Sequence, residues 1–128
     1  MKYMGIDYGT KRVGIALSDE TNGFALPLKV IENTRKLFDE INTIVCDKEV
    51  THIIVGESKD FKGEDNKVMD KIRSFKEDLE NKFTLPVIFE PEFLTSHAAE
   101  RFQGKNDMHD ASAAALILQS YLDRIKNT

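Results

Sequence analysis

The apolar positions along the chain change their spacing several times, and each change predicts a different element. Residues 2–8, 13–18 and 23–31 form three short apolar runs separated by turn residues, a pattern typical of consecutive strands. Pro27 interrupts the third run, and because proline donates no backbone hydrogen bond we expect that strand at a sheet edge. Residues 53–55 are apolar without alternation, which predicts a covered parallel strand over 51–56. A fifth strand is predicted over 85–89.

Helical spacing separates the later strands. Asn33 or Thr34 can cap a helix whose apolar stripe extends to about residue 49. A second amphipathic helix is predicted over 68–79, a short one over 96–102 and a final one over about 108–125. The polar segment 57–66 is long for a connection, which indicates a functional loop. The predicted order is therefore βββαβαβα with one small extra helix.

This order predicts one domain, residues 1–128, of the α/β class. Three consecutive strands should pair antiparallel, and two helical crossovers should add strands parallel to the first. The result is a five-stranded mixed sheet flanked by helices. Functional groups in open α/β sheets gather at the carboxyl ends of the parallel strands, which here are residues 8–12, 57–60 and 90–92.

Composition supports one folded domain, and charge raises a question. At 128 residues and 41% hydrophobic, the chain can bury a core, and it shows neither a secretory pattern nor an apolar run long enough for a membrane span. We therefore expect a cytoplasmic protein that does not enter a membrane, with its single cysteine, Cys46, in the core. The net charge of −4 provides no basic field for nucleic acid, so charge alone argues against a nucleic-acid enzyme.

Asp7 is the most informative residue, because it lies in a run that should form a central, apolar strand. A carboxylate buried there without compensation would cost several kcal/mol, so it should bind a metal, meet a cation or accept backbone hydrogen bonds. The alternative to a functional role is that Asp7 accepts hydrogen bonds from the turn that follows it.

Two further carboxylates are candidates by topology. Asp110 opens the final helix, where it is as readily a helix-capping residue as a ligand, and Glu92 follows the fifth strand, where alone it would be an ordinary loop residue. The first strand, the fifth strand and the last helix can converge on one edge of the sheet. Convergent carboxylates suit Mg²⁺ or Mn²⁺, and two such ions about 3.5–4 Å apart can support phosphodiester hydrolysis.

The segments GIDYGTKRVGIALSD at 5–19 and AAALILQSYL at 113–122 resemble the YqgF family over nearly the whole chain. That family consists of ribonuclease H-like nucleases described as pre-16S rRNA processing enzymes and as Holliday-junction-resolvase-like proteins. The resemblance implies a ribonuclease H-like fold and a Mg²⁺- or Mn²⁺-dependent nuclease of the bacterial cytoplasm that trims the 5′ end of the small-subunit rRNA precursor. It implies structured RNA and pre-ribosomal particles as partners. Because the sequence shows no obvious dimer surface, the chain itself is expected to be a monomer or weak homodimer. The family's acidic positions fall on Asp7, Glu92 and Asp110.

The chain departs from the family pattern at two places. GESKD at 56–60 stands where the family carries Gly-Leu-Pro-Leu-Asn, and PEF at 91–93 stands where it carries Asp-Glu-Arg. The missing Arg bears on substrate contact at that edge. Glu57 is a candidate auxiliary metal ligand, because more distant ribonuclease H-like resolvases place a carboxylate after the fourth strand; the alternative is a solvated loop residue.

The turn after Asp7 offers phosphate contacts. Lys11 and Arg12 can bind the scissile or a neighbouring phosphate, assisted by Thr10 and backbone donors. The alternative is a solvated hairpin turn.

Three other functions compete with rRNA processing. The GIDYGT opening is also similar to the phosphate loop of actin-like ATPases and sugar kinases, which bind ATP between two large domains that 128 residues cannot supply. Junction resolution on branched DNA needs two active sites and hence a symmetric dimer. A non-catalytic nucleic-acid or ribosome-binding module would keep the fold with an impaired site.

Overall fold

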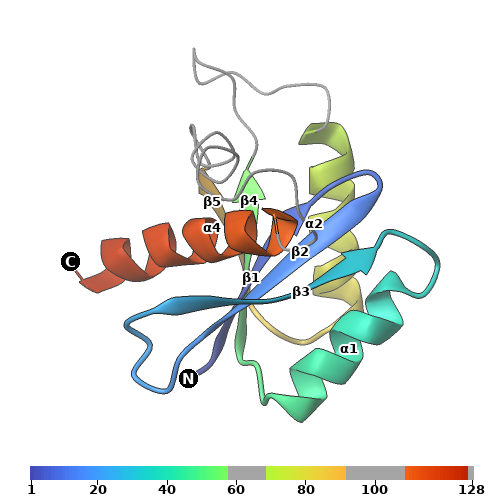
Figure 1. Ribbon diagram of the computed structural model, residues 1–128. Helices are drawn as coiled ribbons and strands as arrows, with labels where there is room; N and C mark the ends of the chain where they lie inside the picture. The colour runs from blue at the N-terminus through green and yellow to red at the C-terminus, as the bar shows by residue number, and fades with distance from the viewer. Residues whose placement is uncertain (58–68, 92–108, 127–128) are drawn as a thin grey trace.

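The predicted strands pair into one sheet of order β3-β2-β1-β4-β5 in the computed structural model, which describes residues 1–57, 69–91 and 109–126 (Figure 1). The strands are β1 (Tyr3–Tyr8), β2 (Arg12–Ser18), β3 (Ala25–Glu32), β4 (His52–Glu57) and β5 (Val87–Pro91). The described helices are α1 (Leu37–Asp47), α2 (Met69–Lys82) and α4 (His109–Lys126). The helix predicted over 96–102 and nearly all of the loop predicted over 57–66 lie outside the described residues.

Strand pairing confirms the predicted topology. β1 with β2 and β2 with β3 are antiparallel, whereas β1 with β4 and β4 with β5 are parallel. The crossovers between the parallel strands contain α1 and α2. β1 therefore lies in the centre of a mixed sheet, and β3, which contains Pro27, lies at an edge as its sequence predicts.

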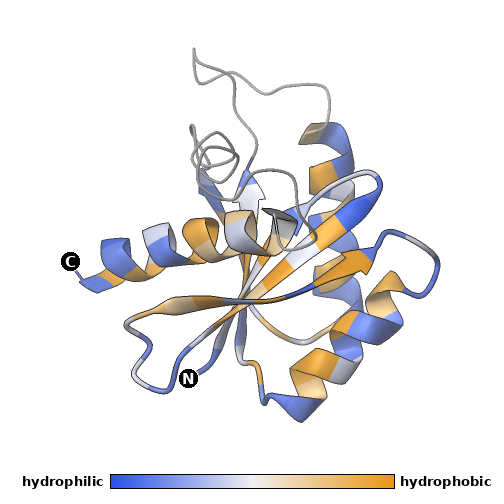
Figure 2. Cartoon of the chain, viewed as in Figure 1, coloured by the Kyte–Doolittle hydropathy of each residue, from blue (hydrophilic) through white to orange (hydrophobic). Residues whose placement is uncertain are grey.

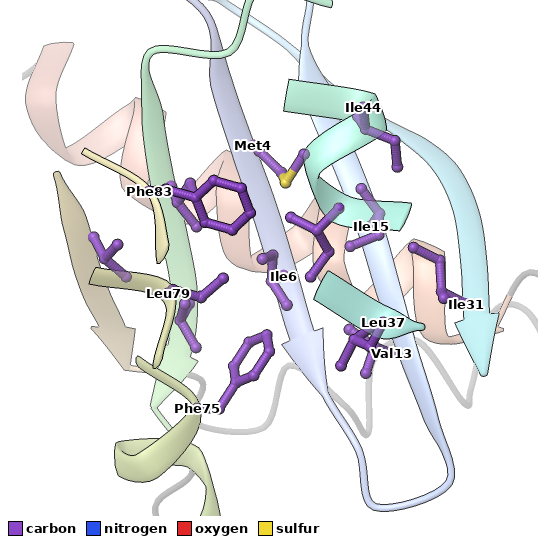
Figure 3. Packing of buried hydrophobic residues seen from close by; sticks show 14 of the residues in the cluster. Met4, Ile6, Val13, Ile15, Ile31, Leu37, Ile44, Phe75, Leu79 and Phe83 are labelled. Atoms are coloured by element: carbon purple, nitrogen blue, oxygen red, sulfur yellow. The ribbon is translucent and has the colours of Figure 1, made fainter. Parts of the chain in front are cut away.

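The two faces of the sheet bury separate sets of apolar side chains. On one face, Met4, Ile6 and Ile15 pack with side chains of α1 and α2, among them Phe75 (Figure 3). On the other face, α4 lies across the sheet (Figure 1). It covers a second cluster, whose buried members are Tyr3, Ala16, Ile54, Ala114, Ile117, Leu118 and Leu122. Hydrophobic residues accordingly follow the strands and the sheet-facing sides of the helices (Figure 2). Because side chains alternate along a strand, odd-numbered positions of β1 face α4.

Gly5 lets α4 approach the central strand closely. A Cβ atom at this position would lie 2.7 Å from Cβ of Leu118 and 2.8 Å from the carbonyl oxygen of Ala114. Both distances are too short for real atoms, so the absence of a side chain at Gly5 is a condition for the packing of α4 on β1.

The start of α1 differs from the sequence prediction. Lys36 occupies the N-cap position and makes no side-chain capping bond. Asn33 instead donates from Nδ2 to the carbonyl oxygen of Gly9 at 2.8 Å, and its backbone N–H donates to the carbonyl oxygen of Lys11 at 2.9 Å. The Asn33 side chain therefore ties the β1–β2 turn to the end of β3, because a tertiary acceptor lies within its reach.

Cys46 is exposed, so its predicted place in the core is wrong. It lies two positions after the buried Ile44 on α1, about 200° around the helix, and this turns it toward solvent. None of the described helices has both the length and the apolarity needed to cross a membrane.

Replacing Gly5 by alanine should lower the free energy of unfolding by about 1–3 kcal/mol, because α4 would have to move away from β1. Urea denaturation measures this change. Lys71→Ala, at an exposed position of α2, is the control and should change stability by no more than about 0.5 kcal/mol. Equal stability of Gly5→Ala and the wild type would contradict the close packing described.

Candidate active site

Asp7 lies near the carboxyl end of the central strand and is half-buried. Alternation along β1 assigns it to the face that α4 covers, two residues beyond Gly5, over which α4 packs. A half-buried carboxylate at this place is accessible from the end of the sheet while its backbone is held by strands on both sides.

The strands beside Asp7 place no side chain next to it on this face. Asp7 pairs with Gly14 on β2. On the other side, Ile6 pairs with Val55, which puts Asp7 level with Gly56 of β4. Residues that pair across strands share a face, so glycines flank the Asp7 carboxylate on both sides. Carboxylate oxygens are the ligands that Mg²⁺ and Mn²⁺ prefer, so Asp7 has the chemistry of a metal ligand.

The direction of α4 brings its first turn toward Asp7. The ring of Tyr121, near the end of α4, lies 5.8 Å from that of Tyr3 at the start of β1. Burial at this contact raises the pKa of the Tyr121 hydroxyl. Earlier residues of α4 contact Gly5, so contacts progress in opposite directions along the helix and the strand. Two residues further along β1, at Asp7, the same progression reaches one helical turn closer to the start of α4, which is its first turn. Asp110 belongs to that turn, although its side chain is outside the described part.

Neither of the other two predicted metal ligands, Glu92 and Glu57, is placed next to Asp7 by the part of the chain that the structure describes. Glu92 lies outside the described residues. Glu57 ends β4, where Ile53 and Val55 face α1 and α2, so alternation assigns Glu57 to the face opposite Asp7. Within the residues that the structure describes, no three His, Cys, Asp or Glu side chains gather as a metal site would require.

The predicted phosphate-binding residues follow Asp7 directly. Thr10, Lys11 and Arg12 are exposed at the β1–β2 turn, with Arg12 opening β2. Asn33 holds this turn from two sides through its bonds to Gly9 and Lys11. A Cβ atom at Gly9 would collide with the carbonyl oxygen of Arg12, so the turn requires glycine there.

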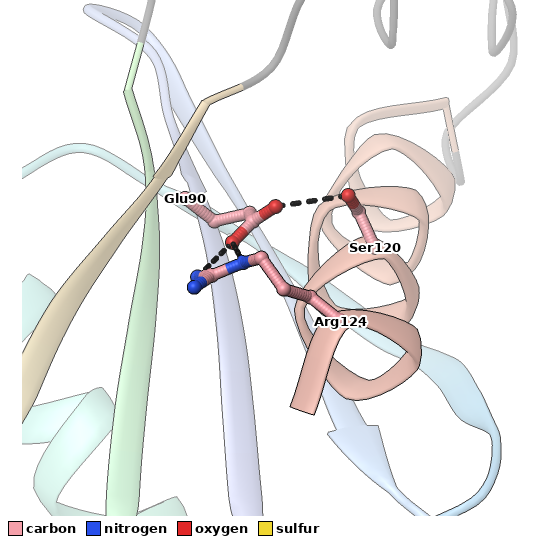
Figure 4. Close-up of polar contacts among 3 residues, drawn as sticks. All are labelled: Glu90, Ser120 and Arg124. Carbon is pink, nitrogen blue, oxygen red and sulfur yellow. Dashed lines mark hydrogen bonds and ion pairs between the residues drawn. The ribbon is translucent and has the colours of Figure 1, made fainter. Parts of the chain in front are cut away.

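Glu90 is a buried acid that the sequence interpretation did not identify. It pairs with Gly56 and is 4% exposed, so it lies in the same cross-strand row as Asp7, about 10 Å away at two strand spacings. Ser120 Oγ donates to its Oε2 at 2.9 Å, and Arg124 donates from Nε to its Oε1 at 3.1 Å and also from Nη2 (Figure 4). The only sequence feature that pointed to this contact is the four-residue spacing of Ser120 and Arg124, which puts both side chains on one face of the helix.

This sheet order, with a carboxylate on the central strand beneath a crossing helix, defines the ribonuclease H-like class of α/β folds. The family model for RuvX, Holliday junction resolvase, matches residues 1–124, and the chain belongs to this family, which confirms the resemblance to YqgF. Membership makes the chain a nuclease, a hydrolase of phosphodiester bonds.

Similar proteins cover the chain almost completely. A protein of Maridesulfovibrio salexigens that carries the name "Putative pre-16S rRNA nuclease" is 38% identical over 97% of this chain and 99% of its own length. One of Sulfurihydrogenibium with the same name is 33% identical over 97% of this chain and 91% of its own. Among solved structures, Thermus thermophilus RuvC in complex with a Holliday junction substrate is similar, with a TM-score of 0.63, 13% identity and coverage of 100% of this chain and 98% of that one. At that identity the likeness concerns the fold.

Replacing Asn33 by alanine should destabilise the protein by about 0.5–1.5 kcal/mol, the usual worth of one hydrogen bond, because the Gly9 carbonyl loses its side-chain donor. Thermal unfolding measures this loss. Asn81→Ala, exposed at the end of α2, is the matched control. The same melting temperature for both variants would show that the Asn33 bond does not hold the turn.

Proposed function

We propose that the chain, as one nuclease domain over 1–128, is a metal-dependent enzyme that hydrolyses phosphodiester bonds at the 5′ end of pre-16S rRNA in the bacterial cytoplasm. The observation that carries this proposal is the shared name of relatives 33–38% identical over 97% of the chain. Structured RNA, in pre-ribosomal particles, is then the substrate of a monomer or weak homodimer.

We assign metal binding to Asp7, Glu92 and Asp110, with Glu57 as an auxiliary candidate. The setting of Asp7 between Gly14 and Gly56 supports this assignment, as does the approach of the first turn of α4. Bound Mg²⁺ or Mn²⁺ would supply an activated water and stabilise the leaving oxygen. Glu57 is the weakest candidate, because alternation along β4 directs it away from Asp7.

Thr10, Lys11 and Arg12 are the proposed substrate contacts. Lys11 and Arg12 present cationic groups to a phosphate, and Thr10 adds a hydroxyl donor, so together they would orient the RNA backbone beside Asp7. The proposed site separates metal-binding carboxylates from phosphate-binding cations, so a net charge of −4 is compatible with a polyanionic substrate. The carboxylates would be neutralised by metal, and the local cations rather than a global basic field would receive the polyanion.

Asp7→Asn should fold normally but cleave a pre-16S rRNA 5′ fragment more than about 100-fold more slowly in Mg²⁺ or Mn²⁺, because an amide is a poor ligand for hard cations. Cleavage is followed on gels, and Mn²⁺ binding by calorimetry. Asp78→Asn, the same change at an exposed position of α2, is the control and should cleave like the wild type.

Two outcomes would contradict the proposal. Cleavage by Asp7→Asn at the wild-type rate would show that Asp7 is not a metal ligand. RNA binding by the wild type without hydrolysis in either ion would favour a non-catalytic binding module.

Junction resolution is the second candidate, favoured by the description of the family model and by the fold shared with RuvC. Because a four-way junction needs two symmetric cuts, this activity requires a dimer. We expect sedimentation to show a monomer or a weak dimer, and a synthetic DNA junction to remain without paired nicks. Symmetric paired nicks by a stable dimer would replace the rRNA proposal with junction resolution.

A further inference from the structure

α4 carries two sets of polar contacts on successive residues, Gln119 and Ser120. Its other described contacts with the sheet are apolar and include the close packing of Ala114 and Leu118 over Gly5, which keeps one face of the helix on the sheet. The polar contacts add partners at defined hydrogen-bond distances and so restrict the rotation of the helix about its own axis further.

Gln119 connects α4 to the β3 edge of the sheet. Its Oε1 accepts from the backbone N–H of Ala25 at 2.9 Å, and its Nε2 donates to the carbonyl oxygen of Gly23 at 3.0 Å. Lys126 Nζ donates to the same carbonyl at 3.3 Å. Both ends of the Gln119 amide are thus engaged by the backbone that leads into β3.

Glu90 connects α4 to the opposite edge of the sheet, formed by β5. Both of its carboxylate oxygens accept hydrogen bonds, one from Ser120 and the other from Arg124 (Figure 4). Successive residues of a helix point about 100° apart, so Gln119 and Ser120 reach toward opposite edges. Contacts to both edges restrict the rotation of α4 from two sides.

The rotation of α4 matters for the proposed site. Asp110 lies in the first turn of the helix, ten positions before Ser120, and a continuous helix transmits rotation along its length. A metal ligand must be held within about 0.5 Å and 10–20° of its productive position. Small rotations of α4 would therefore change where Asp110 stands relative to Asp7.

We propose that Glu90, Ser120 and Arg124, together with Gln119, are positioning residues that restrict the rotation of α4 and so set the position of its first turn relative to Asp7. This inference rests on the proposed metal-dependent function. Removing a carboxylate from water costs free energy, and an apolar pair could stabilise the packing of α4 to a similar extent. What the Glu90–Arg124 ion pair adds is a contact with a defined direction. Glu90 is not offered as a metal ligand, because its two oxygens are occupied by Ser120 and Arg124.

The test compares Glu90→Leu, which removes both acceptors, with Glu90→Gln, which keeps an acceptor oxygen. Glu80→Gln is the matched control, since Glu80 pairs with Lys76 on α2 at 3.1 Å, far from α4 in the chain. Calorimetry with Mn²⁺, well below the melting temperature, should show about tenfold weaker affinity for Glu90→Leu, a smaller loss for Glu90→Gln and none for the control. Cleavage by Glu90→Leu should recover at saturating Mn²⁺.

Hydrogen exchange of the metal-free protein gives an independent readout. Amides of residues 111–115 should exchange faster in Glu90→Leu than in Glu80→Gln, because α4 opens more readily without its contact to β5. If Glu90→Leu fails to fold, Arg124→Lys replaces it; half of the Arg124 side chain is exposed, so the change should be tolerated, and it should weaken Mn²⁺ binding in the same direction.

The outcomes separate this inference from the proposed function. Unchanged Mn²⁺ affinity in a folded Glu90→Leu, with Asp7→Asn no longer binding the ion, would overturn the positioning role and leave the metal site intact. Unchanged exchange at residues 111–115 would overturn it whatever the metal result. Mn²⁺ affinity that does not depend on Asp7 would instead reject the proposed function.

Discussion

The packing of α4 against the central strand is the constraint on which the rest of this structure depends. Without a side chain at Gly5, the backbone of β1 comes within van der Waals reach of Ala114 and Leu118. That approach closes the second core and carries the first turn of α4 toward the end of β1. Asp7 lies two residues beyond Gly5, so the same close packing that stabilises the fold also assembles the proposed site.

Much of the fold is readable from the sequence because it depends on local patterns. The change from apolar runs to helical spacing predicts the element order, and the rules for crossovers then predict a mixed sheet with β1 inside it. Pro27 predicts an edge strand on chemical grounds alone. Asp7 stands out because a charge in an apolar strand needs a partner, and that argument requires no structure.

The remaining features could not be predicted, because they depend on register and on tertiary contacts. That Asp7, Gly56 and Glu90 share one cross-strand row follows from pairings that no periodicity reveals. Asn33 was one of two residues, with Thr34, expected to cap α1 from residue type, but its side chain bonds to a turn 24 residues away in the chain. Glu90 was placed just after the predicted fifth strand, whereas it is buried within β5 and accepts hydrogen bonds from Ser120 and Arg124 on a helix that a linear pattern does not bring near.

The long separation in sequence between β1 and α4 also affects the order in which parts of the fold form during synthesis. Strands β1 to β3 pair with near neighbours and can form early during synthesis, whereas α4 is the last described element to leave the ribosome. The surface that receives α4, around Gly5 and Ile54, stays uncovered until then. A nascent chain therefore cannot form the proposed site until translation has delivered α4.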